Sequence, residues 1–160
     1  MLKWLLMAPV ALLLLAILAG QLGLLRGTPP GDLGVRDGRL KPPSKTPNSV
    51  TSQADLWTDH PQAAHARIAP LAPAGDAVAT LARLQAIVQA TAGAKVEKTE
   101  PGYLYATFTT RLMKYTDDVE FWWDDAAGEV QVRSASRLGN SDLGTNRKRV
   151  EAIRAQLQSR

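Results

Sequence analysis

A long apolar segment near the amino terminus limits how much of this chain is available for a globular domain. From Trp4 to Leu25 the sequence reads WLLMAPVALLLLAILAGQLGLL, in which Gln21 carries the only polar side chain. About 20 apolar residues span the hydrocarbon core of a bilayer, so this segment is long enough to cross one. We therefore predict a transmembrane anchor over residues 1–25. The rest of the 160-residue chain is sufficient for one domain.

A cleaved export signal is the alternative interpretation, with Lys3 as its positive end. Its apolar stretch would be unusually long, and no pair of small residues marks a cleavage site. Cleavage after Ala19 places Ile17 three positions upstream, and cleavage after Gly20 places Leu18 there. We favour an anchor or an uncleaved signal. The basic residues that follow favour a cytoplasmic domain by the positive-inside rule, whereas an N-terminal apolar segment also directs export, so the charges leave the orientation open.

The next segment, residues 26–48, reads RGTPPGDLGVRDGRLKPPSKTPN and is rich in proline and glycine. Because this composition disfavours helix and offers little apolar surface to bury, it predicts a tether. Residues 49–160 then form a single domain. Its first part, residues 49–74, has no clear periodicity, and we expect Trp57 and the run from Ile68 to Leu71 to dock it onto the core.

Apolar spacing predicts two helices in the domain. The first lies between a capping Asp76 and a terminating Gly93, and the second runs from Thr145 to Gln158. The expected inner stripe of the first helix is Ala77, Leu81, Leu84 and Val88. The expected inner stripe of the second is Asn146, Val150, Ile153 and Leu157.

Alternating polar and apolar residues between these helices predict strands. The expected strands are Ala94–Thr99, Tyr103–Leu112, Asp118–Asp124 and one that begins at Val130. The order indicates an α+β domain, in which helices pack on one face of an antiparallel meander sheet of about four strands. The opposite face would carry aromatic and charged side chains, namely Tyr103, Tyr105, Asp118, Glu120, Trp122, Arg133 and Arg137.

A turn at Ala126-Ala127 fixes the register of the last hairpin. It places Glu120 opposite Arg133, while the inward residues of the two strands also match. The matched inward pairs are Phe121 with Val132 and Trp123 with Val130. Asp118 lies diagonal to Arg133 and Arg137, so part of the charge on this face is expected to form cross-strand ion pairs.

The acidic run between residues 116 and 129 is a candidate cation site. It contains Asp117, Asp118, Glu120, Asp124, Asp125 and Glu129. Hard cations bind such oxygen ligands, but the spacing of an EF-hand loop is missing and strand alternation separates neighbours onto opposite faces. We therefore expect no metal and no cofactor. A zinc site at His60 and His65, and a serine hydrolase built on Ser134 or Ser136, are likewise not favoured.

The basic triplet Arg147-Lys148-Arg149 is a candidate anion site. It lies in the first turn of the last helix, where free backbone amides attract anions and the dipole disfavours cations. The alternative is that these side chains pair with the acidic strand or face water. A phosphate loop does not fit, because Thr145-Asn146 follows Gly144 where Lys and Ser or Thr are required. The net charge of +4 is too small to predict nucleic acid as a partner, and the absence of cysteine excludes disulfides and thiol chemistry.

Four blocks of the sequence carry a resemblance. TPNSVTS (46–52), the IAPL run, YTDDVEF (115–121) and RSASRLGNSDLGTNRKRVEAIR (133–154) resemble the family called domain of unknown function 1499, over roughly residues 40–158. Members often carry a Cys-Pro…Pro-Asn-Cys pattern near the start, where Ser44 and Ser49 stand here. The family's motif residues correspond to Asp117, Asp118, Glu120, Phe121, Arg133, Ser134, Ser136, Arg137, Gly139, Asp142, Gly144, Asn146, Arg147 and Arg149.

The resemblance implies no established activity. It implies a bacterial or plastid origin and an exported or membrane-attached protein, which favours a single-pass protein of the inner membrane with its domain in the periplasm. Our hypothesis is a non-enzymatic binding or scaffold module of the envelope that recognises an anionic ligand, a lipid headgroup or an envelope protein. Its candidate binding residues are Arg133, Ser134, Ser136, Arg137, Asn146, Arg147 and Arg149, with an acidic cluster of Asp117, Asp118, Glu120 and Asp142.

The alternative hypothesis is an enzyme for a small substrate. Asp117, Asp118 or Glu120 would then work with Arg133 and Arg137, and these groups would converge on a pocket and show perturbed carboxylate pKa values.

Overall fold

The computed structural model describes residues 2–159, with side chains from Met7 onward. The helices of this part of the chain are α1 (Leu2–Gln21), η1 (Ala54–Leu56, a 3-10 helix), α2 (Ala63–Ala66), α3 (Ala77–Ala90) and α4 (Thr145–Gln158). The strands are β1 (Ser49–Thr51), β2 (Ala94–Glu100), β3 (Tyr103–Thr109), β4 (Thr116–Asp124) and β5 (Glu129–Ser136).

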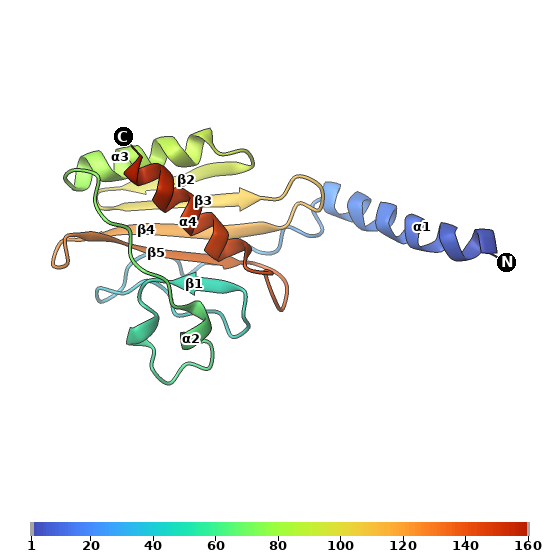
Figure 1. Ribbon diagram of the computed structural model, residues 1–160, viewed down its shortest axis with the longest axis horizontal. Coiled ribbons are helices and arrows are strands. Elements are labelled where there is room, and N and C mark those ends of the chain that lie inside the picture. Colours follow the sequence, from blue (N-terminus) through green and yellow to red (C-terminus); the bar gives the residue numbers. More distant parts are fainter. Residues whose placement is uncertain (1, 160) are drawn as a thin grey trace.

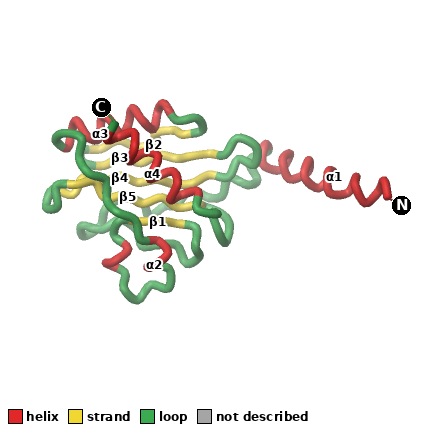
Figure 2. Tube along the Cα trace, viewed as in Figure 1, coloured by secondary structure: helices red, strands yellow, loops and turns green. Residues whose placement is uncertain are grey.

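The sheet confirms the α+β prediction and corrects the number of strands. Within residues 2–159 five antiparallel strands lie in the order β1-β5-β4-β3-β2, and α3 and α4 cover one face (Figures 1 and 2). The additional strand is β1, in which Val50 pairs with Ser134 of β5. Three residues are too few to show a period of two, so pairing with β5 decides this strand.

The hairpin register is the predicted one. Glu120 pairs with Arg133, and the pairs Phe121–Val132 and Trp123–Val130 are also found. Strand β3 ends earlier than expected, because the chain turns between residues 110 and 115 and leaves Leu112 exposed. The apolar face of the sheet and the two helices enclose one core, which includes Leu84, Val88, Phe121, Val150 and Ile153.

The two helices of the domain begin where the sequence indicates. Asp76 Oδ1 accepts a hydrogen bond of 2.8 Å from Ala79 N and so caps α3. The inner stripe of α4 is the predicted one. The stripe of α3 is rotated, since Thr80 and Ile87 are buried with Leu84 and Val88.

Within the expected tether of residues 26–48, the part from Gly34 onward is packed against the domain. Leu40 is only 1% exposed, and its amide donates a 2.7 Å hydrogen bond to Gln53 Oε1. The amide of Gly34 donates to Glu120 Oε1 at 2.7 Å. The segment therefore covers the face of the sheet that α3 and α4 leave free. Polar side chains of that face supply the partners that an irregular backbone needs for burial.

Helix α1 projects away from the end of the sheet (Figure 1). Its last turn contacts the loop between β3 and β4: Gln21 Nε2 donates to the carbonyl of Leu112 at 2.8 Å, and a Cβ on Gly20 would lie 2.4 Å from the carbonyl oxygen of Met113. Among the residues whose side chains the structure describes, no helix has both the length and the apolar character needed to cross a membrane. The first residues of the predicted anchor, 1–6, lie outside those residues.

Candidate functional site

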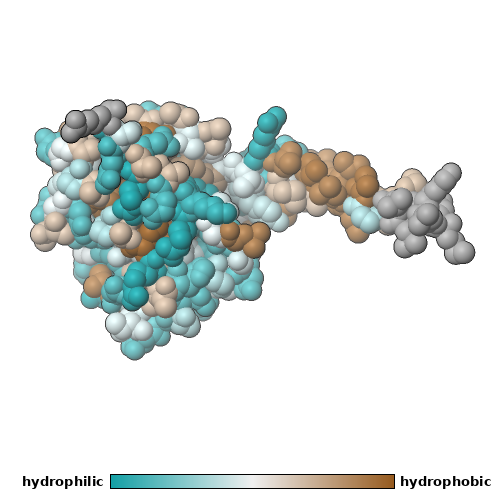
Figure 3. Space-filling view, viewed as in Figure 1, coloured by the Kyte–Doolittle hydropathy of each residue, from teal (hydrophilic) through white to brown (hydrophobic). Residues whose placement is uncertain are grey.

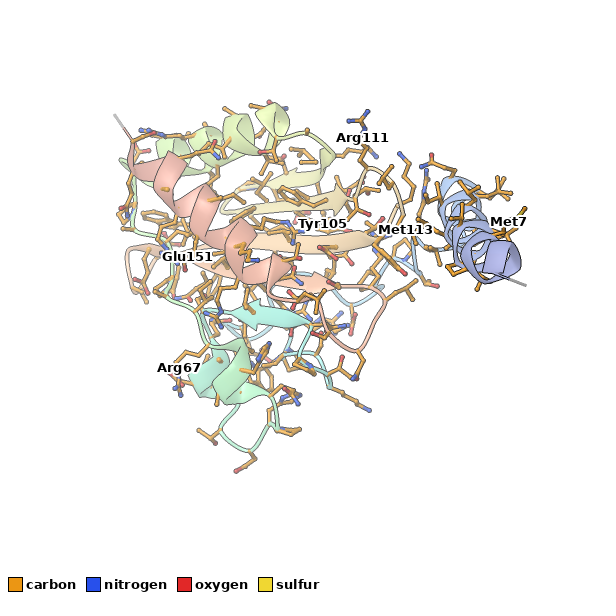
Figure 4. All side chains as sticks on the ribbon, turned by 45° about the vertical axis from the view of Figure 1, so that its right-hand side comes forward. Met7, Arg67, Tyr105, Arg111, Met113 and Glu151 are labelled. Atoms are coloured by element: carbon orange, nitrogen blue, oxygen red, sulfur yellow. The ribbon has the colours of Figure 1, made fainter. Side chains whose placement is uncertain are left out.

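The sheet face opposite α3 and α4 carries a buried polar cluster, which we call the polar face. Strand alternation brings side chains from three neighbouring strands together here, as predicted. Its members are Tyr103, Tyr105, Asp118, Glu120, Arg133 and Arg137. Residues 34–43 cover the face, so these charged groups lie in an interior rather than on an exposed sheet surface. Figure 4 shows Tyr105 in the middle of the sheet.

Arg137 and Asp118 form a closed ion pair. The guanidinium holds both carboxylate oxygens, with Nε 2.9 Å from Oδ2 and Nη2 2.7 Å from Oδ1. The hydroxyl of Tyr105 donates a third hydrogen bond to Asp118 Oδ1 at 2.6 Å. The hydrogen bond to Asp118 raises the pKa of Arg137, whereas burial, followed by the hydrogen bond to Asp118, raises the pKa of Tyr105. The Asp118 carboxylate is therefore fully engaged within the protein.

Arg133 and Glu120 form a looser pair. Arg133 is 4% exposed, and its Nη1 lies 3.8 Å from Glu120 Oε2. Glu120 Oε1 accepts from Tyr103 at 2.8 Å and from Gly34 N, while Oε2 is buried without a hydrogen bond. Burial raises the pKa of Glu120, although Gly34 N and Arg133 oppose this effect. Burial also lowers the pKa of Arg133.

The guanidinium of Arg133 therefore retains free donor capacity. Within the described part of the chain, Nε alone makes a hydrogen bond, to the carbonyl of Pro42 at 3.2 Å. A guanidinium carries five N–H donors, so both terminal nitrogens keep protons that lack an acceptor here.

A pocket of about 730 Å³ opens at this point between the 28–45 segment and the polar face. Residues from both sides line it, including Arg133, Arg137 and the flanking Ser44 and Ala135. Its lining contains four basic side chains, Lys41, Lys45, Arg133 and Arg137, against one carboxylate, Asp118. His60 completes the wall. Because Arg137 neutralises Asp118, the pocket has an excess of positive charge that suits an anionic group.

Most of the other predicted residues, together with Asn48, form a structural network on the opposite face, which we call the polar seam. It lies beneath α4 and joins Asn48, Asp117, Ser134, Ser136, Asn146 and Arg149. Asn146 is central: its Oδ1 accepts from Ser134 Oγ at 2.5 Å and from Arg149 Nη1 at 2.7 Å, and its Nδ2 donates to Asn48 O at 3.0 Å. Arg149 also donates to Asp117 Oδ2 at 2.5 Å and stacks over the ring of Phe108. This network fixes α4 to the sheet.

The start of α4 holds its own carboxylate. Asp142 Oδ2 accepts from Asn146 N at 2.7 Å and Oδ1 accepts from Gly144 N at 3.0 Å. Burial alone would raise the pKa of Asp142, but these amide hydrogen bonds outweigh it and place the pKa below its usual value. The amides of Gly144, Thr145 and Asn146, at the start of α4, thus all donate to Asp142. Arg147 lies apart and donates from Nη2 to the carbonyl of His65 at 2.7 Å.

The structure therefore divides the predicted site residues. It brings Arg133, Arg137, Asp118 and Glu120 together on the polar face, and it places the seam residues on the other side of the sheet. Asp117 and Asp118 are adjacent in sequence and point to opposite faces, so the three candidate catalytic carboxylates do not converge. Among residues 2–159, no group of three or more His, Asp or Glu side chains is placed to hold a metal ion.

The second wall of the pocket was not predicted from the sequence. Lys41 and Lys45 lie in the segment that was expected to be a tether, and His60 lies in the part without periodicity. The only sequence feature that indicated a packed segment was Leu40, an isolated apolar residue among polar ones. The structure buries the side chain of Leu40 completely. Nothing in the sequence indicates that Gly34 contacts Glu120.

Fold and site together define an α+β domain with helices on one sheet face and a basic pocket on the other. The chain belongs to the DUF1499 family: the model of this family, described as a protein of unknown function, matches residues 39–157. No curated protein and no solved structure matches the chain.

Proposed function

We propose that this domain is a binding module that takes a small anionic group, a phosphate or a carboxylate, into the pocket between the 28–45 segment and the polar face. The observation that carries the proposal is Arg133. Its charge is buried at 4% exposure, its carboxylate partner is 3.8 Å away, and its terminal nitrogens lack acceptors beside a pocket of about 730 Å³. A buried cation costs free energy unless hydrogen-bonded partners compensate it, and an anion in the pocket supplies them.

The walls of the pocket support this function. Lys45 comes from the 28–45 segment, and no ion pair involves it among the described residues. Lys41 pairs with Asp32 at 2.5 Å at the exposed rim. An anion between Lys45 and Arg133 would therefore join the 28–45 segment to the sheet through charge-assisted hydrogen bonds.

The enzyme hypothesis has less support. It requires a carboxylate that is free to exchange protons with a substrate in the pocket. Asp118 lines the pocket but is held by Arg137 and Tyr105, and Glu120 lies beneath Gly34. A binding role needs no such group.

We also propose that α1 attaches the protein to the inner membrane as a single-pass anchor, with the domain in the periplasm. The apolar sequence from Trp4 to Leu25 supports this, as do the exposed side chains of Leu12, Leu14 and Leu18 on a helix that projects from the domain (Figure 1). Exposed leucines around a projecting helix favour an apolar partner.

The binding proposal is tested by titrating the full chain, in detergent micelles, with inorganic phosphate in a calorimeter. A parallel titration uses vesicles of phosphatidylcholine with and without phosphatidylglycerol. Free phosphate and a lipid headgroup share the same chemistry, and the two arms separate them as sources. We expect saturable heat in at least one arm, weakened by added salt because the attraction is between charges.

Two lysines provide a matched comparison. Lys45→Ala removes a charge from the pocket, and Lys148→Ala removes the same charge from the exposed side of α4. Loss of one charge-assisted hydrogen bond corresponds to about a tenfold weakening or more, so Lys45→Ala is expected to weaken binding and Lys148→Ala to leave it unchanged. Equal effects of the two variants, or no binding in either arm, would refute the proposal.

A further inference from the structure

Exposed apolar side chains gather at the end of the domain from which α1 leaves. They belong to three segments that are distant in sequence: the connection after α1, the loop between β3 and β4, and the loop between β5 and α4. We call this surface the apolar end; its members are Leu22, Leu24, Leu112, Tyr115, Leu138 and Leu143. Figure 3 shows the apolar colour of α1 and a further apolar patch on the adjoining end of the domain.

Close contacts join the last turn of α1 to the loop between β3 and β4, and Gly27, in the connection after α1, lies against Leu138 of the loop between β5 and α4. Gln21 Nε2 donates to the carbonyl of Leu112, and Gly20 packs against the backbone of Met113. Figure 4 shows Met113 on the side of the domain that faces α1. A pocket of about 460 Å³ at this end is lined by side chains of all three segments, including Leu25, Tyr115 and Leu143. The surface is therefore built by the tertiary structure and is not a property of one mobile loop.

Leu143 gives the strongest indication that the surface has a partner. Its backbone has a φ of +52°, a left-handed conformation that costs a leucine about 1–2 kcal/mol, and its side chain is 86% exposed. The residue thus combines backbone strain with an unfavourable apolar exposure, and no packing within the domain offsets either. A partner that covers the side chain accounts for both features.

The charges around the apolar end identify the kind of partner. Arg26 and Arg111 are exposed, and Lys114 is half-buried, in the same segments. The carboxylates nearby are engaged within the protein, since Asp142 accepts hydrogen bonds from the amides of Gly144 and Asn146 and Asp117 binds Arg149. Apolar side chains ringed by basic ones match the interface of a bilayer with anionic headgroups, where leucines enter the acyl region and long basic side chains reach the phosphates.

We propose that the apolar end of the domain rests in the bilayer interface, with Leu112, Leu138 and Leu143 in the acyl region and Arg26 and Arg111 on anionic headgroups. This surface lies on different residues from the anion pocket. It rests on the proposed attachment through α1, because α1 leaves the domain from this end (Figure 1). Docking fixes the orientation of the domain on the membrane.

The absence of cysteine makes a direct test possible. Single variants Leu112→Cys and Leu143→Cys of the full chain are labelled with a nitroxide and reconstituted in phosphatidylcholine vesicles that contain phosphatidylglycerol. Leu14→Cys reports on α1, and Val78→Cys on α3, 80% exposed, reports on water. Each label is measured for its accessibility to oxygen, which enriches in lipid, and to a nickel chelate, which stays in water.

We expect labels at 112 and 143 to show an oxygen-to-nickel ratio several-fold above that at 78. An oxygen-to-nickel ratio at 112 and 143 equal to that at 78, together with a high ratio at 14, would support the α1 anchor and overturn the docking of the apolar end. Water-like ratios at all four positions would overturn both proposals. Shielding at 112 and 143 that depends on protein concentration at fixed lipid would assign the surface to a second copy of the chain and also overturn the docking.

Discussion

Arg133 and Glu120 face each other on neighbouring strands, yet Nη1 of Arg133 stays 3.8 Å from Oε2 of Glu120 and that oxygen has no hydrogen bond. Both side chains are almost completely buried. The arrangement destabilises the fold, because burial removes the hydration of both charges. The loose ion pair compensates only part of the lost hydration free energy. The same arrangement leaves a cation available to an anion, which is the basis of the proposed binding site.

Breaking this pair from one side is expected to be strongly destabilising. Arg133→Met leaves the Glu120 carboxylate buried without a counter-charge, which lowers the free energy of unfolding by about 3–5 kcal/mol at pH 7. Adding Glu120→Gln keeps an oxygen for Tyr103 and Gly34 and removes the charge, so the double variant is expected to recover more than half of the loss. Urea denaturation of the wild type, of Arg133→Met and Glu120→Gln alone, and of the double variant measures this coupling.

The pH dependence of Arg133→Met gives an independent check. Burial raises the pKa of Glu120, so its contribution to stability is greatest below the unfolded pKa and declines as the pH rises through the folded value. Acidification protonates the isolated carboxylate, and the loss caused by Arg133→Met is therefore expected to shrink between pH 7 and pH 5. A loss that stays constant over this range would contradict the buried-charge explanation.

The polar seam predicts a large effect at an uncharged residue. Asn146 is completely buried and joins α4 to β5 and to Asn48. Asn146→Ala removes one hydrogen bond each from Ser134, Arg149 and the carbonyl of Asn48 and leaves the buried hydroxyl proton of Ser134 without its acceptor, so we expect a loss of about 2–4 kcal/mol in the free energy of unfolding. Lys148→Ala, on the exposed side of the same helix, is expected to change it by less than about 0.5 kcal/mol. Similar losses in the two variants would argue against the seam.

The contribution of Asp142, which caps α4, to stability is expected to depend on pH in the direction opposite to that of Glu120. The folded pKa of Asp142 is lowered, so its stabilisation is present above the unfolded value and is lost as the pH falls through the folded value. Asp142→Asn keeps an acceptor for Gly144 N but removes the charge. Because the group is partly exposed, we expect a cost of only about 0.5–1 kcal/mol at pH 7, vanishing towards about pH 3. Thermal unfolding across this range measures it; a cost that grows on acidification would refute the capping role.

Replacement of Leu143 is expected to stabilise the domain and to weaken its contact with lipid. Leu143→Gly relieves the strain at φ +52° and removes an exposed apolar side chain, so the free energy of unfolding is expected to rise by about 0.5–1 kcal/mol. Leu143→Asn, which tolerates this backbone and is polar, serves as the control. Both variants are expected to weaken the shielding of a nitroxide at position 112 in vesicles. A destabilised Leu143→Gly would show that the leucine packs within the domain.

The sequence predicted those parts of the fold that depend on local pattern. Alternation gave the two faces of β3, β4 and β5, and the matching inward pairs gave the β4–β5 register. Helical spacing gave the whole inner stripe of α4. The side chains of the polar face were predicted, because strand alternation alone places Arg133 and Arg137 on the same face of the sheet. Its covering segment was not predicted, because residues 34–43 have no period and are held by single contacts such as that of Gly34 with Glu120.

What the sequence determined by itself is therefore the family, the α+β class and the side of the sheet to which each charge points. Which charges have a partner depends on the packing of elements that are distant in sequence. Arg137 reaches both oxygens of Asp118, Arg149 reaches Asp117 across the strand-to-helix boundary, and Arg133 is left beside a pocket closed by a segment about 90 residues earlier in the chain. Pairing depends on distances of a few ångströms between elements remote in sequence, and no local pattern of residues encodes them.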